Sequence, residues 1–404
     1  MRRSETHRGQ LGQTGPVTAT AIDFMTAALP GAELHDALRD LRHQGPVVEV
    51  TMYGQPALMV TRYADLRAFF ADQEQFPGGD VYQFHTEPVV GRTFISMNGK
   101  EHDQYRILAM PAFRSRATTR FVDAELVPLA NELVDTFVDR GAADLFTEFV
   151  GRLPFWSISR KLGLPVGTEE HQRRWALKML SYPADPQGAL DAADAVTDFL
   201  MPSVEERLRE PRDDVLSHLL HSDHDGMRFT TEEVVAHVRL LYVVGATTTS
   251  DSMSNLFWTV LQDPDLLIRL RADPELRART VHELLRWEPP VCLLPRVATN
   301  GGVIGGVDVA PGTLLLCAIA SANRDEDVFP DPDRFDPERT EGELLTFGFG
   351  SKFCPGSHMA RQQLDAALGV ILDRLPDLRL VAADPPSGAI LRRTEHLEVA
   401  WGLT

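Results

Sequence analysis

Cys354 stands at the end of the glycine-rich segment FGFGSKFCPG, residues 347–356, and is the residue of this chain best placed for chemistry. The pattern that follows it predicts a helix beginning near Ser357. A cysteine just ahead of a helix start is favoured as a thiolate, because unpaired backbone N–H groups and the positive end of the helix dipole lie beside it. Glycines around it let the backbone turn tightly and approach a flat ligand. A buried, inert cysteine beside a turn is the alternative interpretation.

The other two cysteines do not suggest a disulfide or zinc site. The chain has three cysteines, Cys292, Cys317 and Cys354, which is an odd and sparse set. No Cys-x-x-Cys or Cys-x-x-His pair occurs among them, so the spacings fail every zinc pattern. A reducing compartment is therefore expected.

Three further groups have spacings that place polar side chains together on helices. His102 and Arg106 are four residues apart, and Glu283 and Arg286 are three apart, so each pair shares a helix face. Taken alone, both could be ordinary solvated pairs. The run VGATTTS, residues 244–250, puts glycine and hydroxyl residues in the middle of a long apolar helix, where packing should be tightest.

The cysteine segment resembles the haem-binding loop of the cytochrome P450 family, Phe-Gly-x-Gly-x-x-x-Cys-x-Gly followed by Ala and Arg. The matching positions are Phe347, Gly348, Gly350, Cys354, Gly356, Ala360 and Arg361. The resemblance extends from about residue 38 to residue 397, with its motifs in the right order. It implies that haem b is the cofactor and that Cys354 is the axial ligand of its iron. A thiolate in that position pushes electron density toward the distal oxygen and favours O–O cleavage.

The resemblance also assigns roles to the ionic groups. It implies that His102, Arg106, Arg296 and Lys352 hold the haem propionates, while Phe347, Gly348 and Gly356 contact the haem. Lys352 stands where the family usually has His or Arg. Its ammonium acts as a point charge and cannot make the two parallel hydrogen bonds that an arginine guanidinium makes. It further implies a structural triad, Glu283, Arg286 and Arg334, that supports the cysteine loop.

The mid-helix run resembles the family's Ala-Gly-x-Asp/Glu-Thr-Thr pattern. This implies that Gly245 and Ala246 let the helix open beside the iron and that Thr248 steers protons toward bound dioxygen. Thr247 stands where the pattern has an acidic residue, and its hydroxyl can order a water but carries no carboxylate. Two interpretations stay open: ordinary monooxygenase chemistry, or altered proton delivery that would suit coupling, nitration or peroxygenation.

The resemblance places the substrate pocket in five separate stretches that are mainly apolar, as expected of a concave site over a haem. The candidates are Tyr82, Phe84, Phe94, Val244, Val291, Leu293, Leu294, Ile390 and Leu391.

Composition excludes several classes of partner. Lys plus Arg is 40 and Asp plus Glu is 58, which gives a formal charge of −18. An acidic protein is a poor match for nucleic acid or for an anionic membrane surface. No run approaches the roughly 20 apolar residues that span a bilayer. We expect a cytoplasmic monomer with no nucleic-acid or membrane partner.

The elements that must position these residues are mostly helical. Residues 47–50 and 57–61 predict a hairpin with Gly54 in its turn. Thr230 and Glu233 form a predicted capping box that opens a helix of about thirty residues. Shorter helices are predicted at 264–272 and 274–287, a β-rich stretch at 302–317, and an irregular segment at 325–339.

We therefore expect a mainly α fold with a smaller β portion (α+β), with the haem buried between the long central helix and the cysteine-loop helix. Residues 1–20 are predicted to be a mobile tail and 21–404 a single domain. The expected activity is insertion of one oxygen atom of O2 into a small-to-medium apolar organic substrate, with electrons from a separate ferredoxin and ferredoxin reductase. The alternatives are an atypical oxidation at the same haem and a non-catalytic haem sensor.

Overall fold

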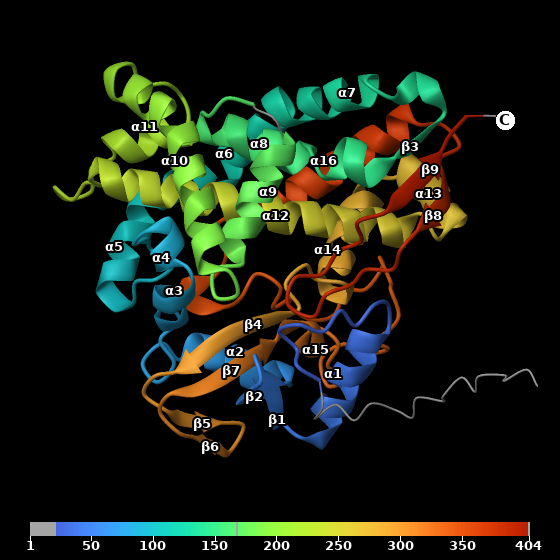
Figure 1. The fold of residues 1–404 in the computed structure, drawn as a ribbon. Coiled ribbons are helices and arrows are strands. Elements are labelled where there is room, and N and C mark those ends of the chain that lie inside the picture. Colours follow the sequence, from blue (N-terminus) through green and yellow to red (C-terminus); the bar gives the residue numbers. More distant parts are fainter. Residues whose placement is uncertain (1–21, 167–168, 403–404) are drawn as a thin grey trace, which may run out of the picture.

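A computed structural model describes residues 22–166 and 169–402, which form a mainly helical part and a smaller β part (Figure 1). This confirms the predicted fold class. The tail predicted for residues 1–20 lies outside the described residues.

The α-helices follow the chain in this order: α1 Glu33–Gln44, α2 Tyr63–Ala71, α3 Asp80–His85, α4 Glu87–Val90, α5 Gly99–Ala109, α6 Ser115–Phe121, α7 Val127–Asp135, α8 Leu153–Leu162, α9 Glu169–Leu180, α10 Pro186–Arg209, α11 Val215–His221, α12 Thr231–Val260, α13 Pro264–Ala272, α14 Pro274–Trp287, α15 Ile319–Ala322 and α16 Ser357–Arg374. Short 3-10 or π turns lie at η2 Met110–Phe113, η3 Val122–Leu126, η4 Val138–Arg140, η5 Phe146–Val150 and η6 Gly350–Lys352.

The strands are β1 Val47–Met52, β2 Gln55–Val60, β3 Ala142–Asp144, β4 Leu293–Ala298, β5 Gly302–Ile304, β6 Val307–Val309, β7 Thr313–Ala318, β8 Arg379–Ala383 and β9 Leu397–Ala400. The largest sheet has the order β1-β2-β7-β4. Its β1–β2 hairpin is antiparallel, β2 runs parallel to β7 with Leu58 opposite Leu315, and β7 pairs antiparallel with β4. The predicted hairpin is confirmed, and Gly54 occupies its turn with a φ of 69°.

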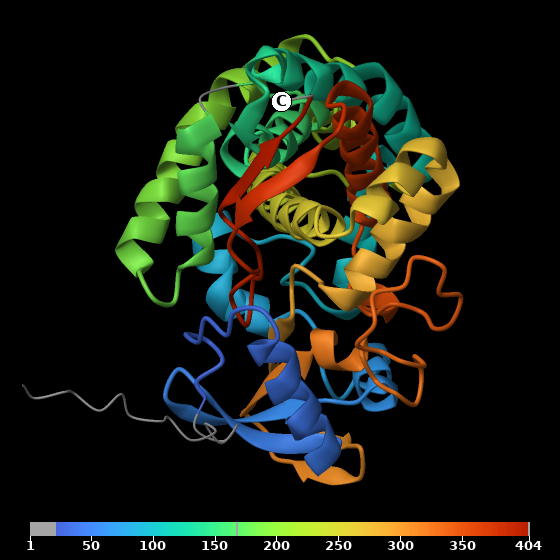
Figure 2. The ribbon, with the colours of Figure 1, turned by 90° about the vertical axis from the view of Figure 1, so that its right-hand side faces the viewer.

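The long helix α12 crosses the helical part and is surrounded by other helices when seen nearly end-on (Figure 2). Its start is fixed as predicted: the Thr230 hydroxyl accepts from Glu233 N, and the Glu233 carboxylate accepts from Thr230 N. Buried residues lie around most of its circumference, from Val234 to Val260. A helix with buried residues around most of its surface must lie inside a core, which is where this one lies.

The remaining predicted elements also match. Helices α13 and α14 have the predicted bounds, and the Asp- and Pro-rich segment 325–339 contains no helix or strand. Helix α16 begins at Ser357, three residues after Cys354, so the cysteine lies just ahead of a helix start. The α16 helix packs against α12 and α14.

Candidate active site

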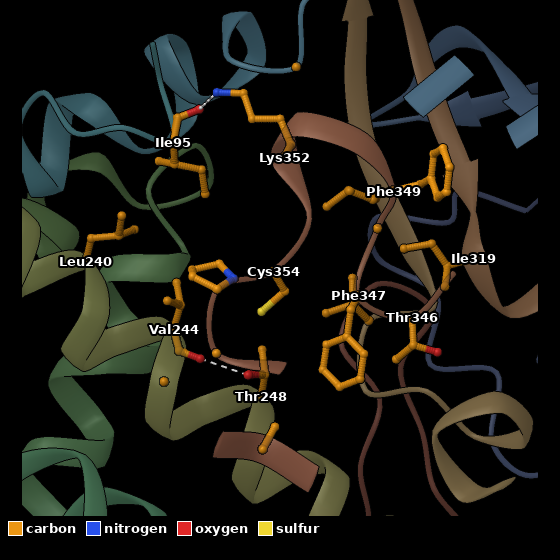
Figure 3. Close-up of a pocket in the computed structure, with 18 of the residues that line it drawn as sticks. Ile95, Leu240, Val244, Thr248, Ile319, Thr346, Phe347, Phe349, Lys352 and Cys354 are labelled. Carbon is orange, nitrogen blue, oxygen red and sulfur yellow. Dashed lines mark hydrogen bonds between the residues drawn. The ribbon is translucent and has the colours of Figure 1, made fainter. Parts of the chain in front are cut away.

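A cavity of about 290 Å³ lies between α12, the cysteine loop and β4. Its wall includes Cys354 from the loop, Thr248 from α12 and Arg296 from β4. In Figure 3 the sulfur of Cys354 points into the space between Thr248 on α12 and Phe347 on the loop. Residues separated by more than a hundred positions in the sequence therefore meet at one concave site.

The backbone around Cys354 is folded into a tight loop. Cys354 N donates to Phe347 O at 2.9 Å, and Gly348 and Gly350 adopt left-handed φ values of 71° and 73°. A Cβ on Gly350 would meet Phe70 O at 3.2 Å, so the loop also packs closely on α2. These glycines are needed because side chains rarely adopt such φ values.

Opposing effects act on the pKa of the Cys354 thiol. Burial raises the pKa of Cys354, whereas the backbone N–H groups of Gly356 and Ser357 and the charges of Arg106 and Arg361 act to lower it. A bound metal cation would deprotonate the sulfur outright. Cys292 and Cys317 are buried away from the cavity, and their pKa values are also raised by burial.

Four basic side chains gather at the cavity. Lys352 Nζ donates to Phe94 O at 3.2 Å and Ile95 O at 3.1 Å, and Arg296 Nη1 donates to the Tyr82 hydroxyl at 3.2 Å. Arg106 donates to Phe353 O, and His102 is 1% exposed. All four predicted propionate residues line the same cavity.

The acidic side chain paired with this cluster is Asp103, which lies beside His102 and is 65% exposed. Burial, followed by repulsion from Arg296 and Arg106, lowers the pKa of Lys352 to about 7. His102 Nε2 is buried with no hydrogen-bond partner in the described part of the chain, while its Nδ1 lies 3.0 Å from Asp103. Cations that are buried or half-buried, together with an unpaired ring nitrogen, are suitable partners for the two carboxylates of a flat ligand. With a cysteine sulfur facing the same cavity, the residues fit a haem held by thiolate and propionates.

Helix α12 presents some of its predicted residues to the cavity and turns others away. Val244, Gly245 and Thr248 line it, whereas Ala246 and Thr247 do not. Successive helix positions are turned by about 100°, so neighbours of Thr248 face different surroundings. The side chains of Ala246 and Thr247 are buried in the core, and the roles assigned to them stay predictions.

The expected opening of α12 is not present. The helix is continuous from Thr231 to Val260. The hydroxyls of Thr247, Thr248 and Thr249 donate to the carbonyls four residues earlier, at 2.9, 2.8 and 2.9 Å. The Thr248 bond, to Val244 O, is drawn in Figure 3.

The structural triad is correct in two members and wrong in the third. Glu283 and Arg286 are almost fully buried and form a two-pronged pair, with Arg286 Nη2 2.7 Å and Nε 2.8 Å from the carboxylate oxygens. Arg334, predicted as the third member, has a side chain 69% exposed and lies 3.9 Å from Asp336. Arg339 takes its place, with Nε 3.3 Å from Glu283 and a side chain 7% exposed. In an irregular segment no periodicity tells which arginine turns inward.

Five of the side chains predicted for the substrate pocket line the cavity, and their contact with substrate stays a prediction: Tyr82, Phe94, Val244, Val291 and Leu294. Phe84 lies outside the cavity lining, and its ring is 69% exposed. Leu293 also lies outside the lining. Because side chains alternate along a strand, it packs into the core on the other face of β4 from Leu294. Ile390 and Leu391 also lie outside the lining, although Leu391 forms a bridge with Val291.

Several lining residues were not predicted. Phe69, Phe70 and Gln73 come from α2 and its end, and Leu240 and Leu241 from α12. The α12 pair could have been found, because positions 241, 244, 245 and 248 follow helical spacing on one face. No sequence signal places α2 beside the cysteine loop.

Comparisons with known proteins agree with this geometry. The family model described as cytochrome P450 matches residues 181–376. Cytochrome P450 107B1 of Saccharopolyspora erythraea is 31% identical, covering 91% of this chain and 95% of that protein. Nocardicin C N-oxygenase of Nocardia uniformis is 33% identical, covering 91% and 96%. The solved structure of cytochrome P450 CYP109Q5 from Chondromyces apiculatus superimposes with a TM-score of 0.84 at 26% identity, covering 96% and 99%. Among the described residues, no helix combines the length and apolar character needed to cross a membrane.

Proposed function

The chain belongs to the cytochrome P450 family and is a haem-thiolate monooxygenase, and from this premise we propose that Cys354 ligates the haem iron and that the cavity beside α12 receives an apolar organic substrate. The observation that carries the proposal is the sulfur of Cys354 facing a cavity edged by four basic side chains. The alternative of a non-catalytic haem sensor is disfavoured, because relatives with this similarity are named as oxygenases and hydroxylases.

The haem supplies dioxygen binding and oxygen activation, and the protein supplies position, charge and exclusion of water. We assign Arg106, Arg296 and the unpaired Nε2 of His102 to the propionates. Lys352 could join them only by exchanging one of its bonds to the carbonyls of Phe94, Ile95 and Met97 for a propionate. Each such charge-assisted bond is roughly twice as strong as a neutral one. Val244, Leu294 and Phe94 form apolar walls that favour a substrate able to leave water. Thr248 lines the cavity, and its hydroxyl, which donates to Val244 O (Figure 3), can still accept a hydrogen bond there.

The test is the spectrum of the purified protein reduced under carbon monoxide. A thiolate ligand gives the strongly red-shifted absorption band of this complex, and Cys354→His should replace it with the band of a nitrogen-ligated haem. The matched control is Cys317→Ser, a buried cysteine away from the cavity, which should leave the band in place. A wild-type protein that binds haem without the thiolate band would contradict the proposal.

We further propose that electrons come from an acidic ferredoxin and that the enzyme acts in the cytoplasm. Arg114, Arg116 and Arg120 are exposed on and beside α6, which packs against α16 behind the cysteine loop. A basic patch on an acidic protein steers an acidic partner, and such steering is screened by salt. Lys352 does not contribute to this surface, because its amine is held by backbone carbonyls inside.

The patch is tested by the double reversal Arg114→Glu/Arg116→Glu. The rate of reduction by a surrogate ferredoxin should fall, most strongly at low ionic strength. The control Arg39→Glu/Arg379→Glu changes the net charge equally on α1 and β8. Equal rates for the two double variants would refute the patch.

A further inference from the structure

His237 is a fully buried histidine of α12 that lies outside the cavity lining, and the proposed mechanism assigns it no task. Both of its ring nitrogens are hydrogen-bonded: Nδ1 lies 2.6 Å from Glu233 O, one turn earlier on α12, and Nε2 accepts from Phe94 N at 3.2 Å. Because a backbone N–H can only donate, Nε2 carries the lone pair and Nδ1 the hydrogen. Burial lowers the pKa of the ring to about 4, so the imidazole is neutral at physiological pH and joins α12 to the main chain of a distant segment.

Aromatic rings hold the imidazole of His237 in this orientation. The Tyr105 ring stacks on it, with ring centroids 6.1 Å apart and ring planes 14° apart, and the centroid of Phe229 lies 4.6 Å away. The Tyr105 hydroxyl also donates to the side chain of Glu233, which ties this stack to α12. A side chain packed on all sides has little freedom to rotate, so the acceptor nitrogen stays directed at Phe94 N.

The segment that His237 holds, residues 93–97, forms part of the cavity wall. Phe94 and Ile95 both line the cavity, and Figure 3 shows Ile95 and Leu240 of α12 on the same side of it. Leu240 follows His237 by three residues, so the two side chains lie on neighbouring turns of one helix face. The histidine therefore stands one turn before α12 reaches the cavity, at the place where the segment joins the helix.

Two different elements bond to the main chain of Phe94. Lys352 Nζ of the cysteine loop donates to Phe94 O at 3.2 Å, whereas His237 of α12 accepts from Phe94 N. A haem propionate can draw the lysine amine away, because an ammonium exchanges one acceptor for another, but the bond to His237 does not depend on that exchange. Gly91, with a φ of 88°, brings the same stretch of chain so close to α12 that a Cβ would meet the Ala236 Cβ at 3.0 Å. His237 is therefore the contact that fixes this segment to α12 whichever partner Lys352 takes.

We propose that His237 is a positioning residue that determines substrate specificity: by holding Phe94 N, it fixes the wall formed by Phe94 and Ile95 against α12 and so sets which apolar molecules fit the cavity. The inference rests on the proposed function of the cavity as a substrate site. A wall that is already ordered favours a ligand of matching shape, because the ligand need not order the wall when it binds. Without this bond the buried Phe94 N–H loses its acceptor, and the wall gains freedom to move.

The test uses two amide side chains that differ by one methylene. In His237→Gln, the side-chain oxygen reaches about the place of the ring Nε2 and can accept from Phe94 N. In His237→Asn, the shorter amide keeps a donor near Glu233 O but does not reach Phe94 N. The control His218→Asn shortens a half-buried histidine of α11 in the same way; its Nε2 is bonded to Leu108 O at 3.0 Å, and Leu108 lies outside the cavity lining.

All proteins are haem-loaded, and the reduced carbon monoxide band is recorded first. Absence of the thiolate band from the wild type would reject the proposed function itself, whereas its presence leaves the role of His237 to two further measurements.

The first measurement needs no turnover. Hydrogen exchange is followed by mass spectrometry of overlapping peptides that isolate the amide of Phe94. This amide should be protected in the wild type, His237→Gln and His218→Asn, and should exchange about tenfold faster in His237→Asn, as expected for the loss of one hydrogen bond. An unprotected Phe94 amide in the wild type would overturn the proposal even if every His237 variant failed to bind haem.

The second measurement is the affinity for imidazole and for 4-phenylimidazole, titrated by the shift in haem absorbance. Both probes bind iron through the same kind of nitrogen, so the ratio of their dissociation constants reports how well the cavity wall contacts the added phenyl ring. Relative to the wild type, the preference for 4-phenylimidazole should fall about tenfold in His237→Asn, the effect of having to order one backbone residue on binding, and should return in His237→Gln. An unchanged ratio in His237→Asn, an equal fall in His218→Asn, or no recovery in His237→Gln would refute the role.

Discussion

The arginine that completes the buried ion pair under the cysteine loop can be identified by replacing Arg339 and Arg334 in turn with alanine. Arg339 bonds Glu283 at 3.3 Å, Asp331 O at 3.0 Å and Arg334 O at 3.2 Å, and its side chain is 7% exposed. Arg334 has one weak contact, 3.9 Å to Asp336, and is 69% exposed. The sequence pattern alone favoured Arg334, so the two variants separate sequence reasoning from structure.

The expected losses follow from these contacts. Without Arg339, Glu283 keeps both bonds to Arg286 and the bond from Asp336 N, so its charge stays compensated. The loss is therefore below the 3–5 kcal/mol expected for an uncompensated buried charge and nearer one or two charge-assisted bonds, about 2–3 kcal/mol. Arg334→Ala should cost no more than about 0.5 kcal/mol, as for an exposed ion pair.

The assay is urea unfolding of the haem-loaded proteins, followed by circular dichroism and by haem absorbance. A shift in midpoint with an unchanged slope reports stability alone. Equal midpoints for the two variants, or a larger loss for Arg334→Ala, would refute the assignment of Arg339.

Three other outcomes are expected. His102→Leu should release haem about tenfold faster to a haem-scavenging protein, because one charge-assisted bond of the order of 1.4 kcal/mol is lost; unchanged release would argue against a propionate at Nε2. Thr248→Val should slow oxygen-dependent turnover while Thr247→Val does not, since only the first side chain lines the cavity, and equal rates for the two would be inconsistent with this geometry. Burial lowers the pKa of His237 to about 4 from an ordinary 6.5, so the folded state binds fewer protons and stability should fall by about 3 kcal/mol as the pH drops from 6.5 to 4. His237→Phe should flatten that pH dependence of the unfolding midpoint, and a slope as steep as in the wild type would exclude His237 as its source.

Features encoded by neighbouring residues were predictable from the sequence. The capping box set the start of α12, Asp-Pro pairs set the starts of α13 and α14, and Gly54 set the hairpin turn. The cysteine motif identified the loop because its residue types and spacing are specific to one kind of site. The roles assigned to its residues, and the single-domain organisation of 21–404, stay predictions.

Features decided by packing between distant segments were not predictable. The position of Glu283 decides which arginine of the irregular segment points inward. The orientation of β4 decides whether Leu293 or Leu294 faces the cavity, and the sequence does not give that orientation. Likewise, the approach of α2 to the cysteine loop depends on a sheet whose strands are far apart in the chain.

The parallel pairing of β2 with β7, which sets Leu58 opposite Leu315, has a consequence for how the protein is made. Ribosomes add about 5–20 residues per second, so the first hairpin waits tens of seconds for its partner strand to emerge. During that interval the outer edge of β2 is open to pairing with other nascent chains. Soluble yield in a recombinant host should therefore depend on the supply of chaperones during synthesis more than on the stability of the finished molecule.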